Sequence, residues 1–333
     1  MATDAEAILR AARRPLVIGM GGGGDVVGAL ATAEAMRLHD DAECLVGGLS
    51  WERRPIDPVP GGRRVSEIAG GWEIAPGILL AGPHTKVADR DVYFAESRMA
   101  AVLGRPTVLV DVNPGAPAVA AGLAAAAASL RRDLIVFVDV GGDVLAQGDE
   151  PGLRSPLCDA LMLAVAGELA AAGQPVLLGV FGLGCDSELT TDEVLARLGD
   201  VAAAGGLAGA RGLTEPVAER LEESLAVVPT EASAQAVRAF RGVSGTVYIR
   251  GGTRSLELSV LAAQTWYLDV PVTIASVGRL ARAVAPAPSL EDANDALHEL
   301  GVRTELDLER EGAAGAAGPS GAGGPSGTSG PTL

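Results

Sequence analysis

The residues best suited to chemistry are acids in one glycine-broken stretch, VDVGGDVLAQGDEPGLRSPLCDA (138–160). Asp139 and Asp143 stand directly at the end of a run of branched aliphatics, and Glu150 follows. Carboxylates held close together repel one another unless a cation or a proton intervenes. Oxygen ligands in a flexible loop suit Mg²⁺ or Mn²⁺, and a carboxylate whose pKa its neighbours raise suits a general base. The stretch therefore predicts Asp139 and Asp143 as catalytic groups or metal ligands, with Glu150 as a third ligand; a solvated acidic loop explains Glu150 equally well.

A second candidate is the glycine-rich stretch GMGGGGDVVGAL (19–30), which follows the first aliphatic run. Its spacing Gly19-x-Gly21-x-x-Gly24 matches the dinucleotide fingerprint, in which backbone amides approach a phosphate at a helix N-terminus. Asp25, however, places a negative charge where that phosphate would sit. We therefore expect a ligand loop in which Asp25 supports catalysis, with NAD(P) as the second choice of cofactor; a tight turn that only packs a helix closely stays open.

Further polar loops follow other aliphatic runs, and each has a purely structural alternative. The stretch 47–62 offers a tryptophan for stacking, a carboxylate and guanidiniums, and it could equally be a self-packed surface loop. The stretch 111–117 forms a proline turn with an asparagine, and 249–259 predicts an anion pocket at the start of a helix. The predicted ligand contacts are Gly21, Gly22, Gly23, Gly24, Trp51, Glu52, Arg53, Asn113, Gly141, Gly142, Ser155, Gly251, Gly252, Thr253 and Arg254.

These loops need a sheet to position them, and the aliphatic runs supply it. Runs without polar alternation are typical of strands buried on both faces. Between them lie helix signals: a proline after Ser155, a capping box at Thr190 and a capping residue at Ser289. The pattern predicts an α/β, Rossmann-like doubly wound, mostly parallel sheet with helices on both faces. Strands are expected at 15–20, 43–48, 77–82, 106–112, 133–140, 175–181, 246–251 and 271–276.

The whole chain of 333 residues is best explained by a single α/β domain over 1–310. Residues 311–333 are mainly glycine, alanine, proline and serine, which cannot bury enough surface to offset chain entropy, so a disordered tail is expected.

Composition excludes several functions. The net charge is −16, with 42 acidic against 26 basic residues, which argues against binding nucleic acid or an anionic membrane surface. Three dispersed cysteines form no zinc or disulfide pattern. Neither a signal peptide nor a membrane-spanning run is present, so a cytoplasmic protein with a small-molecule ligand is expected, and a homo-oligomer stays open. The P-loop, GxSxG and HExxH motifs are also missing.

Several motifs follow one another over nearly the whole predicted domain. In order they are GGGGD, WER with a following DP, VDVGGD…G…SP…DA, and GGTR. In this the chain resembles the family called domain of unknown function 1152, which occurs in archaea and actinobacteria. The resemblance implies one full-length domain whose loops act together, and it implies no activity.

Three functions are consistent with these residues. The first is an enzyme that acts on a nucleoside, nucleotide or sugar-like metabolite, as a hydrolase or lyase assisted by a divalent cation such as Mg²⁺ or Mn²⁺. The second is an NAD(P)-dependent oxidoreductase, supported by the glycine spacing alone. The third is a non-catalytic, ligand-binding regulatory protein. The number of carboxylates favours the first, because perturbed ionisable groups gather at working sites.

Overall fold

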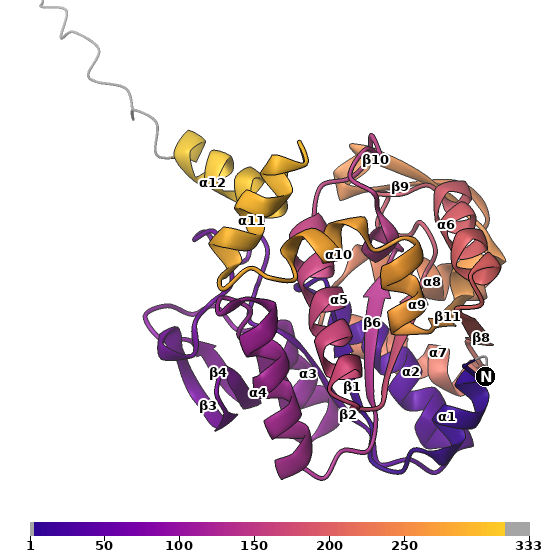
Figure 1. Ribbon diagram of the computed structural model, residues 1–333, viewed down its shortest axis with the longest axis horizontal. Coiled ribbons are helices and arrows are strands. Elements are labelled where there is room, and N and C mark those ends of the chain that lie inside the picture. The colour runs from indigo at the N-terminus through magenta and orange to yellow at the C-terminus, as the bar shows by residue number, and fades with distance from the viewer. Residues whose placement is uncertain (1–2, 317–333) are drawn as a thin grey trace, which may run out of the picture.

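A nine-stranded mixed sheet, with helices on both faces, forms the centre of the computed structural model, which describes residues 3–316 (Figure 1). The strands, in order across the sheet, are β3 (Ile68–Ala75), β4 (Ile78–Val87), β5 (Thr107–Val110), β2 (Leu45–Leu49), β1 (Leu16–Gly19), β6 (Ile135–Val140), β7 (Val176–Phe181), β11 (Gln264–Leu268) and β8 (Leu207–Gly212). The central strands from β5 to β7 pair in parallel, and the two outer pairings on each side, β3–β4 and β4–β5, and β7–β11 and β11–β8, are antiparallel. The predicted α/β class and Rossmann-like sheet are confirmed.

The parallel strands follow the order β5-β2-β1-β6-β7, so the chain builds outward from β1 in one direction and then crosses to β6 on the other side. This is the strand order of dinucleotide-binding sheets, in which the loops after the two central strands separate and leave a crevice. The register pairs Gly19, the last residue of β1, with Val138 of β6, so the loop after β6 begins two residues further along than the loop after β1. The crevice therefore lies between the glycine-rich stretch and the acidic stretch.

Alternating strand residues face two apolar layers, which explains the unbroken aliphatic runs. In β1, Leu16 and Ile18 pack into one layer and Val17 into the other. The first layer is covered by α4 (Gly115–Ser129), α5 (Pro156–Ala171), α6 (Thr191–Ala203), α9 (Val270–Ser276), α10 (Arg279–Val284), α11 (Leu290–Glu299) and α12 (Glu305–Ala316). The second is covered by α1 (Ala5–Ala11), α2 (Asp25–His39), α3 (Ala95–Leu103), α7 (Glu215–Leu225) and α8 (Glu231–Phe240). Within residues 3–316, no helix is both long and apolar enough to span a bilayer.

Two predicted strands differ from the structure. Residues 271–276 form helix α9, because Asp269 accepts a hydrogen bond from the Val272 amide and Pro271 lies in the first turn. Residues 246–251 contribute β9 (Gly245–Ile249), which pairs only with β10 (Arg254–Leu258) in a separate antiparallel hairpin. The prediction of a helix after the 249–253 loop is therefore wrong, and strand β10 occupies that position.

The outer strands β3 and β8 were not among the predicted strands, since glycines interrupt their sequences and no aliphatic run marks them. At the other end of the chain, α12 extends to Ala316, past the boundary at 310 that was expected for the tail. The rest of the predicted tail, 317–333, lies outside the described residues.

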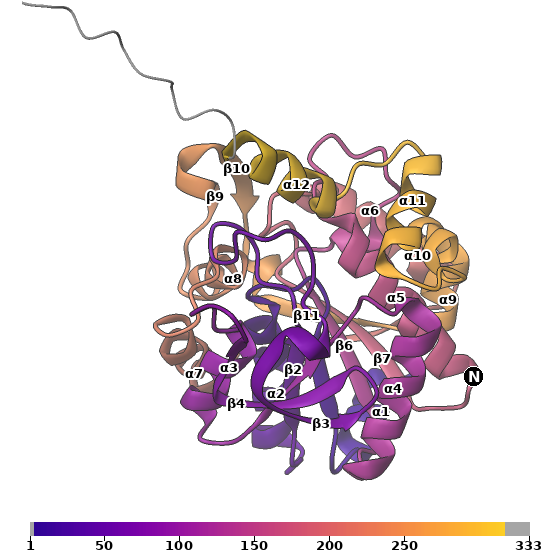
Figure 2. The ribbon, with the colours of Figure 1, turned by 90° about the vertical axis from the view of Figure 1, so that its left-hand side faces the viewer.

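Helix α12 and the β9–β10 hairpin both lie at the end of the sheet toward which β6 runs (Figures 1 and 2). The carboxyl ends of the parallel strands meet there, so segments from both ends of the chain stand around the crevice.

Candidate functional site

A cavity of about 280 Å³ opens at the carboxyl ends of β1 and β6. It is lined by Gly21, Gly22, Gly23, Gly24, Asp25, Glu52, Arg53, Arg54, Pro55, Ile56, Ala95, Arg98, Val140, Asp143, Ser155, Asp159, Asp186, Glu188, Val228, Pro229, Thr230, Glu231, Ala232 and Arg250. Ligands of open α/β sheets bind at this position, because the loops of the strands converge there. The structure thus brings the predicted glycine loop and acidic loop to one cavity.

Three aspartates from separate elements meet at the cavity: Asp25 and Asp159 line it, and Asp139 lies beside them. Asp25 begins α2, Asp139 is near the end of β6, and Asp159 lies in the first turn of α5. Each offers one carboxylate oxygen, and these oxygens all lie within 4.8 Å of one another. At that separation two ionised carboxylates repel by about 3.5 kcal/mol at an effective dielectric constant of about 20. The group is therefore unstable as three bare anions and needs a cation or protons.

A second acidic group contains Asp143, Asp186 and Glu188, whose ligand oxygens also lie within 4.8 Å of one another. Glu188 is already bonded here: it accepts from the Arg154 amide at 2.7 Å, the Ser155 amide at 2.8 Å and the Ser155 hydroxyl at 2.6 Å. Asp186 in turn accepts from the Glu188 amide at 3.1 Å. Much of this group therefore holds the start of α5 in place.

Burial changes the protonation of the acids. It raises the pKa of Asp25 to about 8, with a further contribution from Asp139, although Asp25 still meets the cavity. It raises the pKa of Asp139 to about 7 and that of Glu52 to about 7. The pKa of Asp143 lies well above its ordinary value, because of burial first and the charges of neighbouring carboxylates second. Groups that titrate near neutral pH can accept or donate protons during a reaction.

Arginines add positive charge to the lining of the cavity. Arg53 donates to the Gly21 carbonyl and, at 3.3 Å, to Glu305, and it lies over the Trp51 ring at 4.6 Å. Arg98 and Arg250 also line the cavity. Carboxylates of this lining can bind a cation, and its guanidiniums can bind a phosphate or carboxylate.

The glycine loop shows why the dinucleotide fingerprint is not sufficient here. Asp25 accepts a hydrogen bond from the Gly21 amide at 2.9 Å, so the carboxylate occupies a donor that a phosphate would need. Gly24 packs so closely on Thr230 that a Cβ would lie 2.3 Å from its side chain. Close packing is thus part of the role of this loop, in agreement with the alternative in which the loop is a tight turn that packs a helix.

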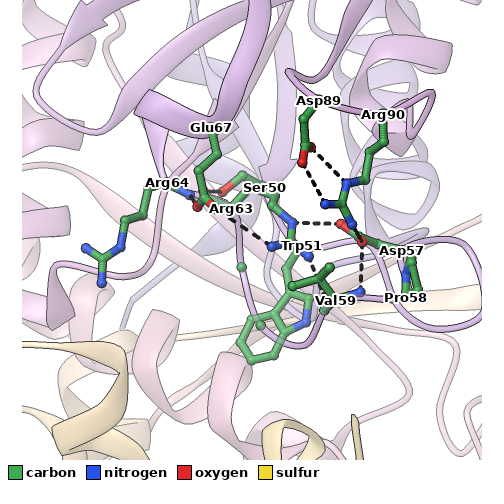
Figure 3. Close-up of polar contacts among 12 residues, drawn as sticks. Ser50, Trp51, Asp57, Pro58, Val59, Arg63, Arg64, Glu67, Asp89 and Arg90 are labelled. Atoms are coloured by element: carbon green, nitrogen blue, oxygen red, sulfur yellow. Dashed lines mark hydrogen bonds and ion pairs between the residues drawn. The ribbon is translucent and has the colours of Figure 1, made fainter. Parts of the chain in front are cut away.

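Ion pairs hold the loop after β2, and one of them is buried (Figure 3). Arg63 pairs with Asp57 at 2.7 Å, and both side chains are almost fully buried. The Trp51 indole points away from these pairs; it is fully buried and donates to Glu309 of α12 at 3.0 Å. Trp51 is absent from the cavity lining and serves as a core residue, whereas its neighbour Glu52 does line the cavity.

The structure brings most, but not all, of the predicted site residues together. Asp139 lies beside the cavity with Asp25, and Gly141 backs onto Asp186, whose carboxyl carbon a Cβ there would meet at 2.3 Å. Gly142 adjoins it, at the start of the turn that carries Asp143. The other lining residues that were predicted are Gly21, Gly22, Gly23, Gly24, Glu52, Arg53, Asp143 and Ser155.

Other predicted residues lie elsewhere. Glu150 accepts from the amides of Gln147 and Gly148, so it closes its own turn and belongs to neither acidic group. Asn113 donates to the Gly62 carbonyl at 3.0 Å and to Asp111 at 2.7 Å. Its side chain therefore stabilises the proline turn and does not line the cavity.

The predicted anion pocket is also displaced. Gly251, Gly252, Thr253 and Arg254 belong to the β9–β10 turn and the strand after it, with no helix N-terminus, and the lining residue of this hairpin is Arg250.

Several lining residues were missed, and one of them carried a signal. Asp159 stands in the first helical turn after Ser155-Pro156, a position that points toward the end of the neighbouring strand. Nothing local distinguishes Arg98 or Arg250 from surface arginines. Ser155 precedes α5 but does not cap it through its side chain: the Ser155 hydroxyl bonds Glu188, and Glu305 accepts from the amides of Leu157 and Cys158, each at 2.9 Å.

Comparison with known proteins adds a family and no activity. No curated protein and no solved structure matches the chain at a significant level. A family model described as "Protein of unknown function (DUF1152)" matches residues 16–313, which include every strand and every lining residue of the cavity. The chain therefore belongs to the DUF1152 family.

Proposed function

We propose that this protein is an enzyme that acts on a nucleoside, nucleotide or sugar-like metabolite carrying an anionic group, as a hydrolase or lyase assisted by Mg²⁺ or Mn²⁺. One observation supports the proposal: buried carboxylates and arginines line the same cavity, at the point where the sheet order reverses. The arginines would hold the anionic group, and the carboxylates would hold the cation and handle protons.

Asp143 is the candidate for proton transfer. It lines the cavity, and burial together with neighbouring carboxylates raises its pKa well above the ordinary value. In the proposed reaction it takes a proton from water or from the substrate and returns it to the leaving group. A bound cation would stabilise negative charge that develops on the substrate.

The test is a turnover screen of the full chain with Mg²⁺ or Mn²⁺ against phosphorylated nucleosides and sugars, read by mass spectrometry. Asp143→Asn is expected to lower kcat by about 100-fold or more, because it removes the proton-transfer group. Asp149→Asn is the matched control, since it makes the same change at an exposed acid of the same loop. Absence of turnover across the panel, or an Asp143→Asn chain as active as the wild type, would refute the proposal.

An NAD(P)-dependent oxidoreductase is the second candidate, supported by the strand order and the glycine spacing. The bond between Asp25 and the Gly21 amide weighs against it. Quenching of protein fluorescence on titration with NADH would favour this candidate. Binding of panel compounds without turnover would favour a regulatory protein instead.

A further inference from the structure

The group formed by Asp25, Asp139 and Asp159, here called the three-aspartate group, has buried oxygens without partners. Asp139 is 1% exposed, and neither of its carboxylate oxygens has a hydrogen-bond partner among residues 3–316. Asp159 is 2% exposed, and its Oδ1 is equally without a partner in that range. A buried carboxylate is costly unless it is paired or coordinates a metal. These oxygens therefore need either protons or an ion that the protein atoms do not supply.

No described arginine forms an ion pair with the three-aspartate group. The charge of Arg53 partly offsets the burial that raises the pKa of Asp25 and Asp159, but the Arg53 guanidinium donates to the Gly21 carbonyl and pairs with Glu305 and Glu309 rather than with the aspartates. Within the described part of the chain, no Lys, Arg or His lies within ion-pair distance of any of the three aspartates.

The second acidic group provides an internal comparison. Its Glu188 already accepts three hydrogen bonds from the start of α5, and Asp186 accepts one from the Glu188 amide. Among residues 3–316, the three-aspartate group accepts one hydrogen bond of ordinary geometry, from the Gly21 amide to Asp25, while the nearby amides of Gly142 and Val144 partly offset the burial that raises the pKa of Asp139. That bond orients Asp25 and leaves the remaining oxygens available.

We propose that Asp25, Asp139 and Asp159 bind one Mg²⁺ or Mn²⁺ ion, in place of the set Asp139, Asp143 and Glu150 that the sequence predicted. Three carboxylate oxygens from β6 and from the starts of α2 and α5 form an all-oxygen ligand set, which suits hard divalent cations and leaves positions for water or substrate. The site refines the cation of the proposed function, but binding of the metal alone can be measured without any reaction.

The test is Mn²⁺ titration of the EDTA-treated, dialysed full chain, followed by the electron paramagnetic resonance signal of free Mn²⁺. We expect one ion per chain, displaced by excess Mg²⁺. Asp139→Asn should weaken binding by about tenfold or more, since even changes outside the ligand shell cost that much. Asp186→Asn and Asp149→Asn, which remove a carboxylate from the second group and from the exposed loop, should bind as the wild type does.

Folding of each variant is checked by circular dichroism. If Asp139→Asn does not fold, Asp159→Asn, which removes a ligand from α5 instead of β6, tests the same loss of Mn²⁺ binding. Absence of stoichiometric binding at millimolar Mn²⁺ would overturn the inference, as would loss of binding in Asp186→Asn with retention in Asp139→Asn. These results are distinct from failure of the proposed function, in which the ion binds but no panel substrate is converted.

Discussion

Asp25 shows how one residue changes the meaning of a motif. The glycines around it have the spacing of a phosphate cradle, yet the Asp25 carboxylate accepts the Gly21 amide and faces Asp139 and Asp159. A loop of this kind places a carboxyl group where the motif would receive an anion. The same burial that raises the pKa of Asp25 to about 8 makes this residue sensitive to pH.

We predict that the metal-free chain loses stability as pH rises from about 4 to about 8, and that Asp25→Asn reduces this loss. The Asp25 pKa is about 8 in the folded chain and near 4 when unfolded, so the folded state holds the proton more tightly across this range. The contribution of this proton to the free energy of unfolding is therefore fully present below about pH 4 and is lost as the pH rises through about 8. Urea unfolding midpoints in EDTA at pH 5 and 8 measure the effect.

Asp149→Asn is the control for that series, because it removes an exposed acid. Profiles that run parallel for the wild type and Asp25→Asn would contradict the assignment of the raised pKa to Asp25.

Helix α12 connects the end of the described chain to the cavity. Its Glu305 accepts the amides of Leu157 and Cys158 at the start of α5 and pairs with Arg53. Its Glu309 accepts from the Trp51 indole and from the Gly61 amide. One helix therefore holds α5, which carries Asp159, and the loop that carries Arg53.

We predict that Glu305→Ala lowers the free energy of unfolding by about 1–3 kcal/mol. The change leaves two helix-terminal amides and a partly buried guanidinium without their acceptor. Urea denaturation followed by circular dichroism measures the loss. Glu311→Ala is the matched control on the same helix, since Glu311 forms only an exposed pair with Arg303 and should matter little. Equal effects of the two changes would show that Glu305 does not cap α5.

At the scale of the whole molecule, the cavity joins segments that are distant in sequence. Its lining runs from the glycine loop near the start of the chain to Arg250, and the strand order places these segments around one crevice. An ion or ligand bound there contacts several elements at once, so its binding energy should stabilise the folded chain as a unit.

We predict that Mn²⁺ at about 100 times its Kd raises the free energy of unfolding by about 2.7 kcal/mol, as binding to the folded state alone requires. Urea denaturation with and without Mn²⁺ measures the rise. Asp139→Asn should show no rise at the same concentration. A wild-type midpoint that does not move would mean that the ion binds the unfolded chain equally or does not bind.

The sequence by itself determined the parallel centre of the sheet and several helix starts. The aliphatic runs around Leu16, Leu45 and Ile135 require burial on both faces, and the capping signals at Thr190 and Ser289 act within one turn of the chain. Local signals were weaker at the edges of the fold: residues 271–276 have branched side chains but form a helix, because Asp269 and Pro271 start one.

Only the tertiary structure decided which polar residues meet. Asp139 and Asp143 were predicted because they follow a buried strand, and the strand order then brings Asp25 and Asp159 to Asp139. Glu150 lies close to Asp143 in sequence but turns to its own backbone amides. Trp51 and Arg53 likewise depend on a helix that begins at residue 305. Backbone preference acts over a few residues, whereas contacts between side chains depend on how distant strands and helices pack.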